Sequence, residues 1–245
     1  MTIKEFFSKI SKKLDLYFFN PSWRCLNCGR EVFDGHEFCE ECLKTLPYND
    51  GAICDHCGRK LNVFSNYWST CKGKLVDLDK CRSVFNYAPP ISKLIKHAKY
   101  DNAKYLLDYF AKQLSNLYLQ SYFNADYLTY VPRTKKAEKR RGYNQSKLLA
   151  QKLCEKVGVQ VLDCLVKTKE TKRQATLTAN ERRKNLADAF KVIDKKSVKG
   201  KSILIVDDVT TTGATAQILA QKLKSAGAIN VYLITVASVP PFDKY

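Results

Sequence analysis

The sequence contains no apolar run long enough to span a membrane, and residues 1–20 lack the small-residue cleavage site of a secretory signal. We therefore expect a cytoplasmic protein with no integral membrane segment. Acidic residues are also scarce, since 24 Asp and Glu stand against 42 Lys and Arg and leave a formal net charge of +18. That imbalance favours a polyanionic partner such as nucleic acid, although a solvated lysine-rich surface would give the same composition.

No stretch is low in complexity, and no repeat is evident outside the cysteine-rich segment. With 245 residues, of which 45% are hydrophobic and 27% charged, the chain can form one sizeable core and a smaller module. Ten cysteines would suggest disulfides in a secreted protein, but in a cytosolic protein their paired spacing indicates metal binding.

The N-terminal residues 1–20 place apolar side chains at helical spacing, with lysines between them. This pattern predicts an amphipathic helix. A basic helix of this kind can dock peripherally on the inner face of a membrane, whereas packing against the protein itself or against a partner is the favoured interpretation.

Residues 21–82 hold eight of the ten cysteines and form the predicted zinc-binding module. Its first half contains two CxxC pairs, Cys25 with Cys28 and Cys39 with Cys42. Two thiolates separated by two residues can hold one ion from a tight turn, so the two pairs predict a closed tetrahedral zinc site. Because such a site has no open coordination position, we expect the zinc to be structural.

The second half of the module repeats this pattern less regularly, because position 74, where another cysteine is expected, is Lys. The thiols available to a second zinc ion are Cys54, Cys57, Cys71 and Cys81. His56 or His36 could replace one of these ligands, and the alternative is a degenerate half without metal. We therefore expect one or two structural zinc ions.

Downstream of residue 82 the pattern changes to strands that alternate with helices. Strands are expected at 83–87, 127–131, 159–166, 203–206 and 231–239. Helices are expected at 91–122, with a break near 100–102, at 146–157 and at 216–226. This alternation predicts an α/β domain over residues 83–245, with a mainly parallel sheet and flanking helices.

The most informative segment begins with the apolar run 203–206, which is typical of a strand covered on both faces. Two carboxylates, Asp207 and Asp208, stand where that strand is expected to emerge. The loop that follows consists of Val209, Thr210, Thr211, Thr212, Gly213, Ala214 and Thr215. Its backbone N–H groups and hydroxyls, together with the N-terminus of the next helix, can hold a phosphate. No Gly-Lys-Ser/Thr sequence follows the glycine, which excludes a nucleoside-triphosphate P-loop.

The acidic pair would repel a bare phosphate, but it suits the hydroxyls of a ribose or a divalent metal ion. The segment therefore predicts a site for ribose 5′-phosphate, with the hydroxyls at Asp207 and Asp208 and the phosphate in the threonine-rich loop. The simpler alternative is a buried strand that ends in an ordinary Asp-rich turn.

A basic loop after the strand at 127–131 is the second predicted anion site. Its candidate contacts are Arg133, Lys135, Lys139, Arg140, Arg141 and Tyr143. The cations could steady a pyrophosphate, and Tyr143 could stack on a base, although such a tyrosine more often packs. The alternative is a nucleic-acid patch on an exposed loop, and the run is long enough for both.

Residues 167–190 contain few apolar side chains before Leu186. We expect this segment to act as a hood over the site, because closure would exclude water from a reaction that transfers a group to an acceptor. A flexible basic surface loop is the simpler alternative.

Together these motifs resemble the ComF family of bacterial phosphoribosyltransferase-like proteins, which are associated with DNA uptake and natural transformation. The resemblance rests on the cysteine pairs, the Arg-Gly-Tyr-Asn-Gln run at 141–145 and the pattern at 174–190. It also rests on segment 203–215, which is similar to the thirteen-residue phosphoribosyl pyrophosphate (PRPP) motif of type I phosphoribosyltransferases. The resemblance implies a type I phosphoribosyltransferase fold with a hood, preceded by a small zinc-ribbon-like module. It further implies Mg²⁺-dependent PRPP binding and the handling of internalised single-stranded DNA, with a competence helicase or another DNA-processing protein as partner.

Two interpretations of the function stay open at this point. In the first, the protein is a phosphoribosyltransferase in which Asp207 and Asp208 stabilise positive charge at the anomeric carbon, and its acceptor is unknown. In the second, PRPP is only a regulatory ligand of a non-catalytic adaptor that binds single-stranded DNA, since a fold does not determine an activity. Because both carboxylates are intact, the sequence favours genuine PRPP binding over a lapsed site.

Overall fold

The computed structural model describes residues 23–33, 36–54, 56–59, 75–100, 103–170 and 186–239. The predicted N-terminal helix, Cys71 and most of the predicted hood lie outside these residues. The chain divides into two compact units, Met1–Leu46 and Pro47–Tyr245. The zinc-binding module expected over residues 21–82 therefore spans both units.

The described part of the smaller unit contains a tight turn and one short helix, α2 (Glu40–Lys44). Hydrogen bonds from Cys25 N to Arg30 O and from Gly29 N to Cys25 O tie the turn. Gly29 has a φ of +74°, a left-handed conformation that residues with a Cβ rarely adopt. The turn and the helix are the two scaffolds that carry the paired cysteines.

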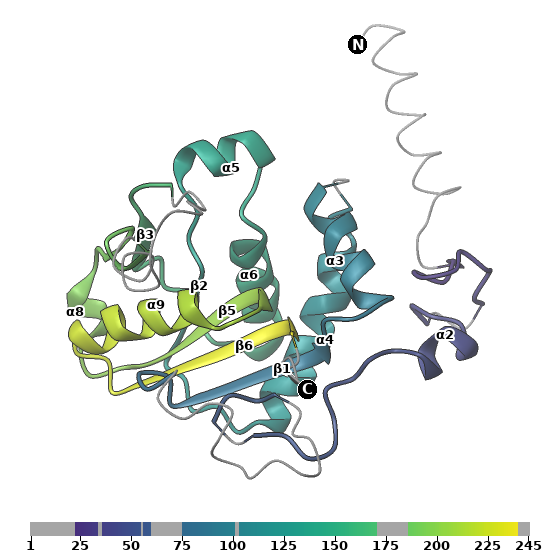
Figure 1. Cartoon of the computed structure of the whole chain (residues 1–245), viewed down its shortest axis with the longest axis horizontal. Helices are drawn as coiled ribbons and strands as arrows, with labels where there is room; N and C mark the ends of the chain where they lie inside the picture. The colour runs from purple at the N-terminus through teal and green to yellow at the C-terminus, as the bar shows by residue number, and fades with distance from the viewer. Residues whose placement is uncertain are drawn as a thin grey trace, which may run out of the picture. The chain divides into compact units, whose positions relative to one another are not determined.

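A four-stranded sheet forms the centre of the larger unit, in the order β1-β6-β5-β2, and all neighbouring strands are parallel (Figure 1). The strands are β1 (Lys80–Asn86), β2 (Tyr127–Tyr130), β5 (Ser202–Thr210) and β6 (Asn230–Ser238). β5 and β6 are largely buried, as expected for parallel strands that are covered on both faces. The predicted α/β fold is therefore confirmed.

Helices cover both faces of this sheet. They are α3 (Ile91–Tyr100), α4 (Leu106–Gln120), α5 (Lys135–Arg141), α6 (Gln145–Val157), α8 (Lys195–Val198) and α9 (Ala214–Ser225). α4 and α6 pack against each other and the sheet on one face, and α9 packs on the other (Figure 1). Side chains along β5 point alternately to the two faces of the sheet, so both faces present apolar residues to helices. Ile203 and Ile205 share one core with Leu219 of α9. Among the helices of the described ranges, none combines the length and apolar character needed to cross a membrane.

The prediction of a strand at 159–166 is wrong in its extent. Its pairing with the main sheet is limited to an isolated parallel bridge between Val161 and Leu128. The chain then leaves the main sheet, because β3 (Leu165–Lys167) pairs antiparallel with β4 (Phe190–Val192) in a separate two-stranded sheet. β3 and β4 lie at the two ends of the segment that the sequence predicts to be a hood.

The elements on either side of the site also differ in extent from the prediction. Part of the expected basic loop after β2 is the helix α5, because Thr134 caps its N-terminus by accepting a 3.1 Å hydrogen bond from Ala137 N. β5 runs past residue 206, through the acidic pair to Thr210, since its backbone stays paired with β6 as far as Ser238. The acidic pair is therefore part of a strand and not of a loop.

Candidate functional site

The acidic pair lies at the carboxyl end of β5 and is held by hydrogen bonds and an ion pair. Asp207 Oδ1 accepts hydrogen bonds from Ser146 Oγ at 2.6 Å and from Asp208 N at 2.9 Å. Asp208 Oδ2 lies 2.8 Å from Lys99 Nζ, and the Asp208 side chain is only 9% exposed. Since Ser146 belongs to α6 and Lys99 to α3, three elements that are distant in sequence meet here.

The electrostatics of this pair favour a bound cation or hydroxyl donors. Burial and the neighbouring Asp208 carboxylate raise the pKa of Asp207 to about 7. The hydrogen bond from Ser146 and the charge of Lys99 oppose this rise without cancelling it. A carboxylate whose ionised form is disfavoured gains from a nearby cation, so the pair suits Mg²⁺ or the hydroxyls of a ribose.

Lys99 and Ser146 are site residues that sequence reasoning missed. Lys99 lies in the last turn of α3, where basic residues are ordinary because they complement the helix dipole. Ser146 lies at the beginning of α6 and is buried. Their contacts with the acidic pair connect separate elements, and no local pattern distinguishes either residue from its neighbours.

A cleft of about 430 Å³ opens beside the acidic pair. β5 contributes Asp207 and Asp208, and the segment after β2 contributes Arg133. The other polar and charged residues that line it are Thr134, Arg140, Ser146, Lys167, Glu170 and Thr215. Burial and the nearby Arg141 guanidinium lower the pKa of Arg133. The cleft therefore combines two carboxylates with several cations, as a ligand that carries both hydroxyls and a pyrophosphate requires.

Only part of the predicted basic loop reaches this cleft. Arg133 and Arg140 line it. Lys135 and Lys139 are exposed on α5 and do not belong to its lining. The basic segment thus has one part in the cleft and another part that faces solvent.

Arg141 and Tyr143 pack near α3. The guanidinium carbon of Arg141 lies 5.0 Å from the centroid of the Tyr100 ring. Tyr143 is buried, its hydroxyl donates to the Ala98 carbonyl oxygen, and Lys104 Nζ lies 4.9 Å from its ring centroid. These contacts support the packing interpretation of Tyr143 and not the stacking of a base on its ring.

The threonine-rich loop borders a second, smaller cavity of about 60 Å³. The residues that line it are Asp207, Leu233 and the continuous stretch from Val209 to Ala216. Gly213, with a φ of +79°, makes the turn that leads into α9, a helix of 12 residues. The positive end of that helix begins at the cavity and favours an anion there. The structure thus gathers all the predicted phosphate-loop residues beside the acidic pair.

Gly213→Ala should weaken phosphate binding. The φ of +79° disfavours a residue with a Cβ by roughly 1–2 kcal/mol, and the added Cβ would lie 2.7 Å from Leu75 Cδ2. We expect the loop to shift and the affinity for ribose 5-phosphate to fall by roughly tenfold, or about 1.4 kcal/mol, in equilibrium dialysis. Gly158→Ala is the matched control, because Gly158 has a φ of +74° but open space at its Cβ position. An equal loss of affinity in both variants would contradict the assignment of the loop.

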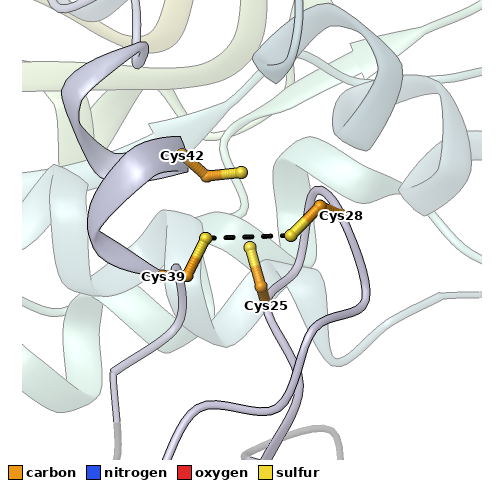
Figure 2. Close-up of side chains that lie close together, drawn as sticks. All are labelled: Cys25, Cys28, Cys39 and Cys42. Atoms are coloured by element: carbon orange, nitrogen blue, oxygen red, sulfur yellow. Dashed lines mark hydrogen bonds between the residues drawn. The ribbon is translucent and has the colours of Figure 1, made fainter.

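The first four cysteines lie close enough to share one metal ion. The Sγ atoms of Cys25, Cys28, Cys39 and Cys42 all lie within 4.8 Å of one another and point toward a common centre (Figure 2). Cys28 Sγ and Cys39 Sγ are 3.7 Å apart. Tetrahedral zinc with Zn–S bonds of about 2.3 Å requires S–S separations of about 3.8 Å, so this quartet fits a structural zinc ion.

The second half of the predicted module lies only partly within the described residues. Its described thiols, all buried, are Cys54, Cys57 and Cys81. The turn at Cys54 repeats the first one, with 2.9 Å hydrogen bonds from Cys54 N to Arg59 O and from Gly58 N to Cys54 O. Within the described ranges, the first quartet alone meets the distances of a metal site. His56, considered as a substitute ligand, has Nε2 2.8 Å from Leu75 O, and His36 is exposed.

Comparison with known proteins finds matches to two domain families. A family model of the double zinc ribbon domain matches residues 15–75, and one of the phosphoribosyl transferase domain matches residues 139–241. Competence protein F of Haemophilus influenzae is 31% identical over 222 residues, which cover 86% of this chain and 93% of that protein. The DNA utilization protein YhgH of Escherichia coli O157:H7 is 32% identical over 218 residues, with 84% and 93% covered. The competence protein ComFC of Bacillus subtilis is 27% identical over 206 residues, with 80% and 83% covered.

Proposed function

This chain belongs to the competence protein F family, and we propose that it binds PRPP and acts on single-stranded DNA that the cell has taken up. It combines a double zinc ribbon with a domain of the type I phosphoribosyltransferase fold. The names of its relatives, competence protein and DNA utilization protein, support a role in DNA uptake. The net charge of +18 supports a nucleic-acid partner independently of those names.

One observation carries the proposal of PRPP binding: an acidic pair, a threonine-rich loop and confined cations meet at the end of one strand. PRPP presents hydroxyls, a 5′-phosphate and a pyrophosphate, which need three different surroundings. In the proposed complex Asp207 and Asp208 accept hydrogen bonds from the ribose hydroxyls, and the loop at 210–215 holds the 5′-phosphate. Arg133 and Arg140 contact the pyrophosphate from the wall of the larger cleft.

Mg²⁺ fits the same carboxylates, because it prefers oxygen ligands and the raised pKa of Asp207 favours a nearby cation. Asp207 and Asp208 would hold the ion together with ligand oxygens, and the ion would neutralise the charge of the pyrophosphate. Ser146 and Lys99 already hold the two carboxylates in place. The site therefore needs little reorganisation when a ligand binds.

We propose phosphoribosyl transfer as the reaction of this site. The bond between the anomeric carbon and pyrophosphate breaks, an acceptor forms a bond to that carbon, and pyrophosphate leaves. Positive charge that develops at the carbon is stabilised by the carboxylates of Asp207 and Asp208. Lys167 and Phe190, from the two ends of the predicted hood, line the cleft and would help to exclude water there.

Pyrophosphate release tests this reaction against the non-catalytic alternative. The protein is incubated with Mg²⁺, PRPP and either candidate bases or oligonucleotides. Pyrophosphate release that occurs only when an acceptor is present supports phosphoribosyl transfer. PRPP binding without release, together with a change in DNA affinity, would support an adaptor that uses PRPP as a regulatory ligand. Failure to bind PRPP at all would reject both.

The exposed part of the basic segment favours DNA binding next to the cleft. Lys135, Lys136 and Lys139 are exposed on α5, and Arg140 on the same helix lines the cleft. Each phosphate contact of single-stranded DNA contributes about 0.7 to the slope of log affinity against log salt concentration. Replacing the three lysines by Gln should therefore reduce that slope by about 2, as measured by fluorescence anisotropy with an oligonucleotide.

Three lysines elsewhere on the larger unit provide a control of equal charge. Lys195, Lys196 and Lys199 are exposed near α8. Their replacement by Gln removes the same net charge without touching α5. Equal slopes for the two triple variants would contradict a local DNA contact at α5.

We propose a cytoplasmic location for this function, since the described cysteines are free thiols and four of them are arranged for metal binding. Peripheral association with the inner face of the membrane, through the N-terminal residues, would bring the protein near incoming DNA. A competence helicase or another DNA-processing protein is the partner that this role calls for.

A further inference from the structure

The turn at Cys54 contacts the phosphate loop directly. Arg59 follows this turn, and its Nη2 donates a hydrogen bond to the carbonyl oxygen of Thr211, 152 residues away in sequence. Leu75 packs on the same loop, since its Cδ2 lies 2.7 Å from the position that a Cβ on Gly213 would take. The cysteine-rich segment therefore packs against the loop that borders the proposed site for the 5′-phosphate.

A third contact joins the same segment to the first turns of α9. Gln217 Nε2 donates to Asp77 Oδ2 at 2.5 Å, and Asp77 N donates to Gln217 Oε1 at 3.3 Å. Gln217 is buried and Asp77 is half-buried, and this reciprocal pair holds the start of α9 against the segment near residue 77. The N-terminal end of α9 is thus attached to the same segment as the loop before it.

The cysteine turn holds both Arg59 and Leu75 in position. The Arg59 carbonyl oxygen accepts a 2.9 Å hydrogen bond from Cys54 N, and the Leu75 carbonyl oxygen lies 2.8 Å from His56 Nε2. Cys81 N donates to His56 O at 2.7 Å, which connects the turn to the beginning of β1. The two residues that contact the phosphate loop are therefore anchored by the turn, Arg59 by the backbone of Cys54 and Leu75 by the side chain of His56.

The hydrogen bond from Arg59 has a consequence for the orientation of the loop. In a trans peptide unit the C=O and N–H bonds point in opposite directions. Holding the Thr211 carbonyl oxygen on Arg59 therefore turns the N–H of Thr212 to the opposite side. Thr211 and Thr212 both line the 60 Å³ cavity, where an N–H group is the donor that a phosphate needs.

We propose that Arg59 is a positioning residue for the 5′-phosphate of the sugar-phosphate ligand, and that the turn at Cys54 is its anchor. This inference rests on the proposed function, because it assigns a role within the same site. Arg59 presets the Thr211–Thr212 peptide and adds a positive charge beside the loop. Arg59 therefore acts on the phosphate through the Thr211–Thr212 peptide and its own charge, and not by lining the 60 Å³ cavity.

The test compares ligands that contain the 5′-phosphate with one that lacks it. Equilibrium dialysis in Mg²⁺ measures PRPP, ribose 5-phosphate and inorganic pyrophosphate against wild-type protein, Arg59→Met and Arg59→Lys. A hydrogen bond to a charged group corresponds to about a tenfold to hundredfold change in affinity. We expect the affinity of Arg59→Met for PRPP and for ribose 5-phosphate to fall by that factor, while its affinity for pyrophosphate stays unchanged. Arg59→Lys should recover part of the loss, because an ammonium group can still donate to the Thr211 carbonyl oxygen.

Arg24→Met is the matched control, since Arg24 is exposed and belongs to the other compact unit. It should bind all three ligands like the wild type. Equal weakening of all three ligands by Arg59→Met, or no weakening of any, would overturn the positioning role while leaving PRPP binding by the wild type intact. Absence of PRPP binding by the wild type would instead overturn the proposed function, and this inference with it.

Discussion

Asp207→Asn should make the ligand-free protein more stable at pH 8 and at the same time remove its binding of PRPP. The pKa of Asp207 is raised to about 7, so at pH 8 the folded protein carries an ionised group that its surroundings disfavour. Asn keeps an oxygen that can accept the hydrogen bonds from Ser146 and Asp208 N, but it removes the charge. We expect a gain of about 1–2 kcal/mol, because partial solvation reduces the effect of the full pKa shift.

The pH dependence of this gain follows from the direction of the shift. A carboxyl group whose pKa is higher in the folded protein than in the unfolded chain binds more protons when folded, so its contribution to stability falls as pH rises. This loss of stability occurs between pH 3.8, the pKa of Asp207 in the unfolded chain, and about pH 7, its pKa in the folded protein. The melting temperature of Asp207→Asn should therefore exceed that of the wild type above pH 7 and converge with it near pH 4.

Asp208→Asn should have the opposite effect on stability. Asp208 is paired with Lys99, whose side chain is 18% exposed, and removing the carboxylate leaves that ammonium group without its partner. Breaking a buried ion pair costs about 3–5 kcal/mol, and we expect about 1–3 kcal/mol here because Asp207 still lies near Lys99. Thermal denaturation at pH 8 measures both variants, and a change of the same sign in both would contradict the assigned geometry. Neither variant should bind PRPP.

Cys28→Ser should release one zinc ion per chain and unfold the smaller unit. The apolar side chains that the described part of this unit buries, apart from its cysteines, are Val32, Phe38 and Leu46. So few apolar residues do not form a stable core, whereas a structural zinc ion contributes roughly 10–16 kcal/mol in small zinc domains. We expect rapid proteolysis within residues 23–46, which limited proteolysis followed by mass spectrometry measures.

Cys154→Ser is the control for this substitution. Cys154 is half-buried on α6, away from any cysteine pair in the sequence. The zinc content and the proteolysis pattern of the Cys154→Ser protein should match those of the wild type. A Cys28→Ser protein that keeps the wild-type zinc content, by mass spectrometry of the metal, would rule out the quartet as the metal site.

The parts of the site that lie within one stretch of chain could be predicted from the sequence. The apolar run before Asp207 indicates a strand, and the glycine at 213 indicates the turn before α9, because burial pattern and backbone conformation are local properties. The CxxC spacing predicted the first cysteine quartet for the same reason, since each pair forms within a single turn. Local chemistry thus predicted that the acidic pair and the threonine-rich loop adjoin the end of one strand, and that the four cysteines come together.

Contacts between distant segments could not be predicted in this way. Lys99 is one of many lysines, and its pairing with Asp208 depends on how α3 packs beside the end of β5. The hydrogen bond from Arg59 to Thr211 likewise depends on the folded position of the cysteine turn. The strand expected at 159–166 was wrong in its extent because a strand's partner is chosen in three dimensions. Val161 makes an isolated bridge to Leu128, and residues from Leu165 onward pair with β4.

Equilibrium dialysis of labelled PRPP in the presence of Mg²⁺ tests the sugar-phosphate site most directly. We predict saturable, stoichiometric binding to the zinc-loaded wild-type protein and no binding to a variant that combines Asp207→Asn with Asp208→Asn. Thermal denaturation of the same samples verifies that the double variant is folded. Lack of saturable binding by the wild type, or equal binding by the folded double variant, would contradict the assignment of this strand end as a PRPP site.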